Sequence, residues 1–395
     1  MEFTFTKEQE AFRRKLRSFL RAEIPPDMLM PVINLAEDLY RDEVWELHRV
    51  MAPKMGERGW LSLTWPEEYG GMEADEIMPC VFQEEMRYHG APGWDPQGVS
   101  MVAPLLMHSG TEEQKRRHLP PIARGEVFWC EGYSEPDVGS DLASVRTTAV
   151  EEEDGFLING QKLWTSGANK ADWCHMLART DSKAPKKHRG LTYFLVDMQT
   201  DGITVRPIMD MCGGTTLCEV FFDNVKVPHE GVVGGVNNGW QMAMALLNFE
   251  RSADVGGAAM MRRFFELMTD YLKNRGLLGD PTVKHHLADI FIDMETSRLM
   301  AYRLVSLAKV GAKAEASARA SMSKLFGSEA TQRVSNTMLN LLGTFGQIEN
   351  DPEMEVLQGR IGHWYLQSFT STLARGTSEI QRTILATRGL GLPRN

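Results

Sequence analysis

The spacing of hydrophobic residues predicts helices in the first 120 or so residues. Phe12, Leu16, Phe19 and Leu20 recur among charged residues at the intervals that place them on one helix face. The segments 44 to 51 and 77 to 86 repeat this pattern. Two clusters of turn-forming residues separate the predicted helices, WPEEYGGMEAD at 65 to 75 and HGAPGWDPQG at 89 to 98.

The pattern changes near residue 126, where short runs of β-branched and aromatic residues begin. FLING, TYFLVD, ITVRPI and EVFFDNVKVP are runs of this kind, separated by Gly, Asp and Asn, and they are typical of strands in a compact sheet. From Trp240 onward long helices are predicted again, over 240 to 274, 283 to 310 and 313 to 342.

The predicted order is therefore helices, sheet, helices. We expect a multi-domain protein of α and β structure, with an N-terminal all-α domain over 1 to 124, a central β domain over 125 to 235 and a C-terminal all-α domain over 236 to 395. The sequence has no internal repeat and no low-complexity stretch that would indicate a solenoid or a disordered tail.

Composition limits the class of protein and its partners. The chain is 43% hydrophobic and 24% charged, as a globular protein with a large core would be. Its net charge of −10 argues against nucleic acid as the principal partner. No apolar run approaches the roughly 18 residues of a membrane span, and the start MEFTFTKEQE does not resemble a signal peptide, so we expect a cytoplasmic protein without a membrane span. Five cysteines without a CxxC pair favour reduced core thiols, and no metal site is expected.

Several common catalytic motifs are missing from the sequence. There is no GxGxxG after a predicted strand, no Walker loop, no HExxH and no GxSxG. Nicotinamide-binding, phosphoryl-transfer, zinc-protease and serine-hydrolase functions therefore lose their usual support.

Two segments of the predicted sheet region carry a resemblance, WCEGYSEPDVGSD at 129 to 141 and GQKLWTSGANKADW at 160 to 173. By themselves they could be a strand entering a turn and an aromatic strand leaving through one. Together with EVFFDNVKVP, GW at 239 and 240, NFER at 248 to 251, GTSEIQR and the closing GLGLPR, they resemble the acyl-CoA dehydrogenase family in matching order over nearly the whole chain. YSEP, KKHRG and NFER are most similar to the branch that acts on bulky, branched, cyclic or steroid-side-chain acyl groups.

The resemblance implies three domains: N-terminal helices, a central β-barrel or sheet, and a C-terminal four-helix bundle. It also implies FAD, an acyl-CoA substrate and usually a tetramer. By matching position it implies flavin contacts from the sheet region at Ser134, Gly139, Trp164, Thr165 and Ser166. Ser140, beside Gly139, matches the turn that meets flavin or CoA. The period of two in KLWTSGAN puts Trp164 and Ser166 on one strand face.

The C-terminal helical region carries further matches to the family. Arg275 lies where family members have an arginine that reaches a neighbouring subunit's FAD, although the Phe and Gln that usually follow are absent. The segment NLLGTFG occupies the place of a Gln and Gly-Gly segment, with Asn340, Gly343 and Thr344 at the matching positions. Thr377 and Glu379 match the cofactor side of the last helix.

The expected catalytic base does not lie at the position that many family members use. Many family members have a glutamate directly before the Gly-Thr of the last helix, but here that position is Arg375, which stays protonated and cannot act as a base. A second location known in the family is the first long helix of the C-terminal domain, where this chain has Glu250 after the uncharged stretch WQMAMALLNF. Helical spacing places Glu250 beside Leu246 and near Asp254, and apolar neighbours with a like charge would raise its pKa. The alternative is an exposed helix glutamate.

Three basic positions have both functional and purely structural interpretations. Arg251 matches a CoA-contacting arginine, or it pairs with Asp254. Lys187, in the basic loop APKKHRG with His188, would grip a CoA phosphate, or the loop is a solvated turn. Arg375 either fills the vacated base position or pairs with a distal carboxylate of a dicarboxylic, succinyl-type substrate.

The function implied is FAD-dependent α,β-dehydrogenation of an acyl-CoA to the trans-2-enoyl-CoA. Glu250 would remove the C2 proton while a hydride passes from C3 to flavin N5, and electrons would go on to an electron-transfer flavoprotein. Two alternatives stay open: a non-catalytic flavin-binding subunit of a mixed tetramer, and an oxygen-reactive oxidase or flavin hydroxylase relative. The expected assembly is a homotetramer or a heterotetramer of two subunit types.

Overall fold

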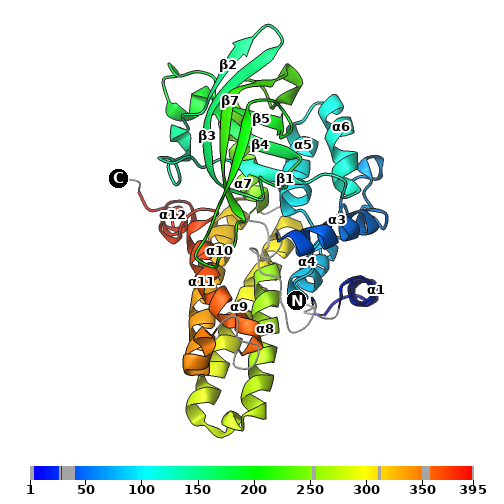
Figure 1. Ribbon diagram of the computed structural model, residues 1–395, viewed down its shortest axis with the longest axis vertical. Helices are drawn as coiled ribbons and strands as arrows, with labels where there is room; N and C mark the ends of the chain where they lie inside the picture. The colour runs from blue at the N-terminus through cyan, green and yellow to red at the C-terminus, as the bar shows by residue number, and fades with distance from the viewer. Residues whose placement is uncertain are drawn as a thin grey trace. The chain divides into compact units, whose positions relative to one another are not determined.

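The structure is a computed structural model that describes residues 4–25, 28, 41–250, 255–309, 313–348 and 356–393, with side chains except at 247–250, 308–309 and 313–317. The chain packs as two compact units (Figure 1). Unit 1 comprises Met1–Leu35, Ala74–Ala91 and Arg251–Asn395, and unit 2 comprises Ala36–Glu73 and Pro92–Glu250. The predicted order of helices, sheet and helices is confirmed.

Unit 2 is built on an eight-stranded sheet in the order β6-β7-β3-β2-β4-β5-β8, with β1 paired to β4. β3 runs antiparallel to β2 and β7, whereas β1 runs parallel to β4. In β3 and β7, buried Val, Ile and Phe residues alternate with partly buried or exposed residues, whereas β5 is buried at every position except its last. The strands are β1 Trp129–Gly132, β2 Thr148–Glu152, β3 Gly155–Ser166, β4 Trp173–Arg179, β5 Leu191–Asp197, β6 Ile203–Ile208, β7 Leu217–Val227 and β8 Val232–Val233.

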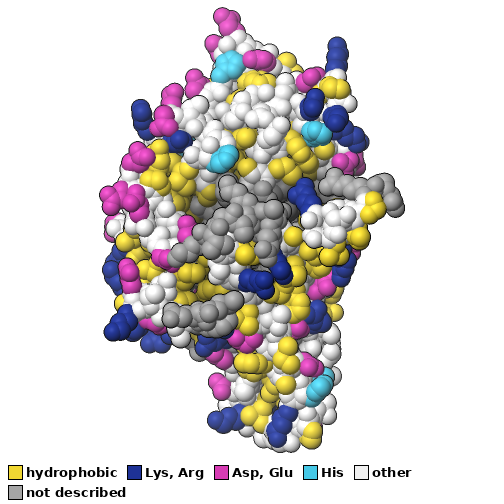
Figure 2. Space-filling model, turned by 180° about the vertical axis from the view of Figure 1, so that it is seen from behind, with side chains coloured by type: hydrophobic (Ala, Val, Ile, Leu, Met, Phe, Trp, Pro, Cys, Tyr) yellow, Lys and Arg dark blue, Asp and Glu magenta, His cyan; other side chains and the backbone are white. Residues whose placement is uncertain are grey.

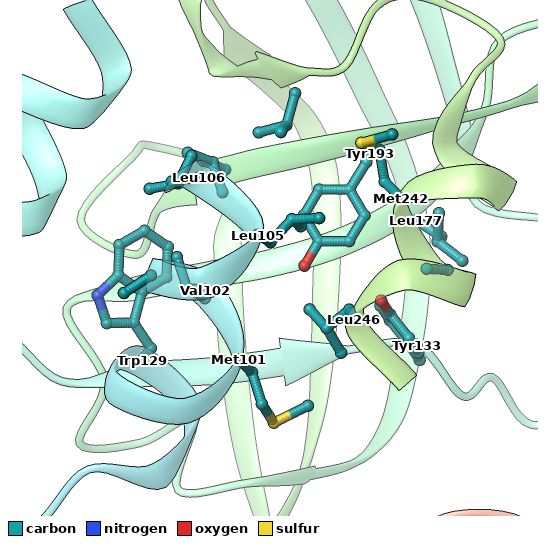
Figure 3. Close-up of a cluster of buried hydrophobic side chains, with 14 of the residues drawn as sticks. Met101, Val102, Leu105, Leu106, Trp129, Tyr133, Leu177, Tyr193, Met242 and Leu246 are labelled. Atoms are coloured by element: carbon teal, nitrogen blue, oxygen red, sulfur yellow. The ribbon is translucent and has the colours of Figure 1, made fainter. Parts of the chain in front are cut away.

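Helices cover part of this sheet through one apolar cluster. Met242 and Leu246 of α7 (Gly239–Glu250) pack there with Tyr133 and Tyr193 from the sheet region (Figure 3). The other helices of unit 2 are α3 Asp42–Gly56, α5 Ala103–Ser109 and α6 Glu112–Ala123, and a π-helical turn, η3 Gly98–Val102, leads into α5. α7 is therefore fixed to the sheet although it lies next to the C-terminal helices in sequence.

Unit 1 contains the predicted four-helix bundle, α8 Val255–Asn274, α9 Pro281–Lys309, α10 Lys313–Leu342 and α11 Arg360–Leu373 (Figure 1). Its core includes Phe264 and Trp364, whose rings stack with centroids 4.4 Å apart. The predicted helix over 240 to 274 is divided here, since α7 belongs to unit 2 and α8 to unit 1. This unit also contains α1 Lys7–Glu23, α4 Met78–Tyr88 and the short α12 Ser378–Ile384.

A buried ion network joins α1 to α4 in unit 1. Glu85 is 2% exposed and accepts hydrogen bonds from Arg13 at 2.8 Å and from Arg17 at 2.6 Å. Burial alone would raise the pKa of Glu85, but hydrogen bonds from His89, Arg17 and Arg13 lower it to about 2.

The start of the last helix lacks the capping box that the local sequence predicts, since a Ser at 378 followed three residues later by Gln381 is the usual pattern. The cap is Thr377, whose hydroxyl accepts from the N–H of Ile380, and the Ser378 side chain is buried. Gln381 instead donates to the carbonyls of Arg375 and Gly376, at 2.9 and 3.3 Å. These carbonyls belong to two consecutive left-handed residues, with φ of 58° and 84°, which a local capping rule does not anticipate.

The three domain boundaries stay a prediction. Secondary structure changes from helix to strand between Ala123 and Trp129 and returns to helix at Gly239. Packing divides the chain differently, because α1 and α4 belong to the unit of the bundle and α7 belongs to the unit of the sheet.

Within the described ranges, no helix is long and apolar enough to cross a membrane, and no group of three or more His, Cys, Asp or Glu side chains is placed to hold a metal ion. All five cysteines are free thiols, and four of them are buried as expected of core thiols, whereas Cys212 is partly exposed. Figure 2 shows acidic and basic side chains interspersed over the face that it presents.

Candidate active site

Trp164 is presented by a bulge in β3. The register against β7 shifts between Lys162, which pairs with Val220, and Thr165, which pairs with Cys218, so β3 carries one extra residue there. Trp164 takes up the irregularity with a left-handed φ of 62°, a strained conformation for a bulky residue. Its indole is 54% exposed. The sheet therefore displays a large aromatic ring at the cost of local strain, as functional sites often do.

The residues after Trp164 divide between two faces. Thr165 is 1% exposed and its hydroxyl has no hydrogen-bond partner among the described residues, whereas Ser166 is partly exposed. Trp164 and Ser166 are thus both accessible, although the bulge interrupts the regular period of two on which the expectation of a shared face rested. The side chain of Thr165 points into the core, so only its backbone can meet a ligand lying against Trp164.

The turn after β1 lies against this bulge. The carbonyl of Ser134 accepts from the N–H of Leu163 at 2.9 Å, which places Ser134 beside the residue preceding Trp164. A Cβ added at Gly139 would meet nothing within 4 Å, and Ser140 is exposed, so this turn leaves space for a ligand to approach the backbone. The structure therefore brings together Ser134, Trp164 and Ser166 from two segments 30 residues apart in the chain.

A buried ion pair holds the same two segments. Lys162 is fully buried, and its Nζ donates to Glu135 Oε1 at 2.9 Å and to the carbonyl of Tyr133 at 3.3 Å. Glu135 also accepts from the N–H groups of Arg146 and Thr147, at 2.7 and 2.9 Å. Burial lowers the pKa of Lys162 despite the nearby carboxylate. Burial alone would raise the pKa of Glu135, but the Lys162 charge and the hydrogen bonds outweigh it and lower that pKa.

The basic loop around Lys187 is tied to the turn that contains Ser140. Lys187 Nζ lies 3.2 Å from Asp141 Oδ2 and 2.8 Å from Ser144 Oγ. Arg179 donates to the carbonyls of Ala143, Val145 and Lys187, at 2.7, 2.9 and 2.9 Å. The segments that carry Lys187 and Ser140 therefore lie together at the surface, and we call them the rim. The ring centroids of His188, in the rim, and Trp240 are 6.0 Å apart.

A buried polar relay lies beneath α7. The Tyr193 hydroxyl contacts His175 Nδ1 at 2.7 Å, and His175 Nε2 contacts Gln97 Oε1 at 3.1 Å. Burial lowers the pKa of His175 to about 3, so its ring is neutral, with one ring nitrogen donating and the other accepting. Leu246 of α7 packs in the same apolar cluster as Tyr193 (Figure 3). Glu250 is the last residue of α7; its side chain and all of Arg251 lie outside the described residues.

The candidates of unit 1 lie at exposed helix ends. The Arg275 guanidinium lies over the rings of Tyr271 and Phe345, at 5.4 and 6.0 Å, so it adjoins the turn η8 Gly343–Gln347 that ends α10. Asn340, Gly343, Thr344, Arg275 and Glu379 are all exposed, and Thr377 is partly exposed.

Arg375 occupies a strained turn before α12. It is exposed and left-handed, and its carbonyl accepts from Gln381. The next carbonyl, that of Gly376, accepts from Lys324 Nζ at 2.8 Å. Close by, α10, α11 and α12 border a polar groove of about 410 Å³. Its lining residues are Glu329, Gln332, Arg333, Thr372, Leu373, Ser378, Glu379 and Arg382.

Comparison with known proteins covers the whole chain. Three family models match: the acyl-CoA dehydrogenase N-terminal domain over 6–126, the middle domain over 130–225 and the C-terminal domain over 237–390. Acyl-CoA dehydrogenase FadE26 of Mycobacterium tuberculosis is 34% identical, over 100% of this chain and 99% of its own. This chain belongs to the acyl-CoA dehydrogenase family. It is an oxidoreductase of a family whose members are flavoproteins, so the expected family and fold class are confirmed.

Solved acyl-CoA dehydrogenases share this fold closely. A structure described as the Tcur3481-Tcur3483 steroid ACAD is similar with a TM-score of 0.90 and 32% identity, covering 100% of both chains. The ChsE4-ChsE5 complex from Mycobacterium tuberculosis has a TM-score of 0.88 and 34% identity, again over 100% of both chains.

Sequence reasoning missed several residues of this acyl-CoA dehydrogenase's candidate site. Lys162 and Glu135 stand inside the quoted segments, and a lysine within a predicted strand, directly before Leu163 and Trp164, was a signal that it could need a buried partner. Tyr193, His175 and Gln97 lie far apart in sequence, and no local pattern joins them.

Proposed function

We propose that this chain binds FAD and oxidises a bulky acyl-CoA thioester to the trans-2-enoyl-CoA. The observation that carries the proposal is the exposed Trp164 side chain on a strained backbone, with Ser166 accessible two residues further on and the Ser134 turn bonded to the same strand. An aromatic ring flanked by hydroxyl donors suits the flat, polar-edged isoalloxazine. When bound, FAD would supply the acceptor for the hydride that leaves C3.

Each unit carries residues that the family resemblance assigns to FAD. Ser134, Gly139, Trp164, Ser166 and the backbone of Thr165 would hold the flavin in unit 2. Arg275, Asn340, Gly343, Thr344, Thr377 and Glu379 are the exposed or partly exposed positions of unit 1 that would meet FAD, by the family resemblance.

Glu250 is the proposed base. It ends α7, a helix with no charged residue before it, and follows buried Leu246 by one helical turn. Removing the weakly acidic C2 proton needs a carboxylate whose pKa lies near working pH, which apolar neighbours favour. Arg375, at the other family position for the base, keeps its proton and cannot serve.

The substrate we propose is a bulky acyl-CoA of the steroid-side-chain or cyclic type, because a similar solved structure is described as a steroid ACAD. Ser140 and Lys187, which the structure places on one rim, would meet the CoA portion together with Arg251. An exposed Arg375 also permits a dicarboxylic acyl group paired to its guanidinium.

A substrate panel tests the proposal directly. Straight, branched, steroid-type and dicarboxylic acyl-CoAs are added anaerobically to the FAD-loaded chain, and bleaching of the flavin absorbance is followed. We expect bleaching by bulky substrates and a loss of at least about 1,000-fold in its rate for Glu250→Gln, since the general base is removed. The matched control Glu152→Gln changes an exposed carboxylate of β2. Full bleaching of the Glu250→Gln protein would remove the base assignment, and unchanged preference in Arg375→Ala would remove the carboxylate pairing.

A second candidate, a mixed tetramer with a partner chain, has its own support. The similar solved structures are named as pairs of chains. Large apolar side chains are also exposed on the bundle, at Phe291, Ile292 and Leu299 of α9 and Leu373 of α11, as subunit interfaces require. Native mass of the chain expressed alone separates a homotetramer from a chain that needs a partner. Reoxidation of the reduced protein by air or by an electron-transfer flavoprotein identifies the acceptor.

A further inference from the structure

We infer that Lys162, held by Glu135, is a positioning residue that fixes the two flavin-facing segments in register and creates the bulge that exposes Trp164. This inference rests on the proposed FAD site. It concerns residues that touch no ligand themselves, since Lys162 is fully buried and Glu135 is 6% exposed.

The bulge follows from where Lys162 must point. Lys162 and Thr165 are three positions apart, so a regular strand would put them on opposite faces. Both are buried, and both pair with β7 residues, Val220 and Cys218, that lie two positions apart and therefore share one face. One extra residue between them is needed to turn both side chains inward. Trp164 takes that place, with its left-handed φ and exposed ring.

The Lys162 side chain points inward because the partners of its ammonium group lie on the buried turn after β1. Its Nζ donates to Glu135 Oε1 and to the Tyr133 carbonyl, the residues on either side of Ser134. One residue along β3, the N–H of Leu163 donates to the carbonyl of Ser134 itself. Three consecutive residues of the turn are thus fixed to two consecutive residues of β3, and Ser134 is held beside Trp164.

The Glu135 carboxylate is fixed in turn. It receives the N–H groups of Arg146 and Thr147, where the segment after the turn enters β2, so its two oxygens hold three donors. A buried ion pair contributes little net stability compared with an apolar pair, because both charges lose their hydration. What this pair supplies, and an apolar pair would not, is a directional link between two segments.

The test compares single and double substitutions in the full chain loaded with FAD. Lys162→Met leaves a buried carboxylate and Glu135→Gln leaves a buried ammonium, so each single variant should lose thermal stability. The double variant Lys162→Met with Glu135→Gln has neither charge, and its amide oxygen accepts from one of the two backbone N–H groups while the other loses its acceptor. We expect it to recover part of the lost stability, yet to bind FAD about tenfold more weakly and to show altered visible circular dichroism of the flavin.

A purely structural role predicts a different result. The folded double variant would then bind FAD with the parent's affinity and the parent's visible circular dichroism, and this outcome would overturn the inference. Should the double variant fail to fold, Glu135→Asp keeps the charge and withdraws the carboxylate by one methylene. We expect a changed flavin spectrum there, and an unchanged one would overturn the inference as well.

The control is Glu126→Gln, which removes an exposed ion pair with Arg124 in the same unit, at 2.6 Å, and should leave flavin affinity and spectrum unaltered. A parent chain that binds no FAD would overturn both this inference and the proposed function. A parent that binds FAD while the double variant matches it would overturn the inference alone.

Discussion

The residues proposed to contact FAD fall into two halves, one in each unit, and the two halves are held in opposite ways. In unit 2, the turn that carries Ser134 and the strand that carries Trp164 are held together by side-chain and backbone hydrogen bonds, of which Lys162 to Glu135 is the most deeply buried. In unit 1, Arg275, Asn340, Thr344 and Glu379 are exposed at the ends of helices. The comparison indicates that the first half is preorganised within its own unit, whereas the second offers side chains that gain their partners on binding.

The largest expected effect of this difference is on acid stability. Burial lowers the pKa of His48 and His118 to about 4 and that of His175 to about 3, all in unit 2. The unfolded chain takes up these protons near pH 6.5, so each histidine stabilises the fold above pH 6.5, and this is lost as pH falls toward 4. The loss is on the order of 3 kcal/mol for each of His48 and His118.

Other buried groups modify this acid response. Burial raises the pKa of Asp95 to about 7, so its stabilising contribution is complete below about pH 4 and is lost as pH rises to 7. The effect of pH on the Asp95 contribution is opposite in sign to its effect on the histidines, but it comes from one group, whereas theirs comes from three. In unit 1 the pKa of Glu85 is lowered to about 2. That carboxylate therefore stabilises the unit above pH 4.5, and its stabilising contribution is lost only as pH falls toward 2.

Hydrogen exchange followed by mass spectrometry at stepped pH separates the two units. Peptides of the sheet unit should lose protection between pH 6.5 and 4, before peptides of the bundle. Loss of protection in the bundle first would contradict the comparison.

A second, smaller effect concerns the relay under α7. Tyr193→Phe leaves Nδ1 of His175 buried without its partner, which should lower the free energy of unfolding by about 1–3 kcal/mol. Tyr69→Phe is the matched control, because Tyr69 packs against the same core but its hydroxyl bonds to Glu112, outside the relay. Urea titrations measure both, and equal losses in the two variants would show that the relay adds nothing to the preorganised half.

The smallest effect tests the exposed half. Arg375 has a left-handed φ of 58° on the surface, so Arg375→Gly should raise the free energy of unfolding by about 0.5–1 kcal/mol. Arg375→Ala removes the same side chain and keeps the strained conformation of a residue with a Cβ, so it should give no such gain. A gain of equal size in both variants would place the effect in the side chain and not in the backbone.

Much of the fold could be predicted from local patterns, and the site only in part. Helical spacing gave the long helices of the C-terminal region, and β-branched runs gave β3, β5, β6 and β7. The cap at Thr377 and the inward Thr165 could not be predicted, because a strained turn and a bulge re-phase the residues that follow them.

The sequence by itself determined the order of helices and strands, the family and the identity of the candidate residues, because these depend on periodicity and on ordered motifs. Only the tertiary structure decided which of those residues meet. Lys162 reaches Glu135, and Tyr193 reaches His175, across 27 and 18 positions of chain. α7 joins the sheet although it borders the bundle helices in sequence. Such contacts depend on where each buried polar group finds its partner, and partners distant in sequence leave no periodic pattern along the chain.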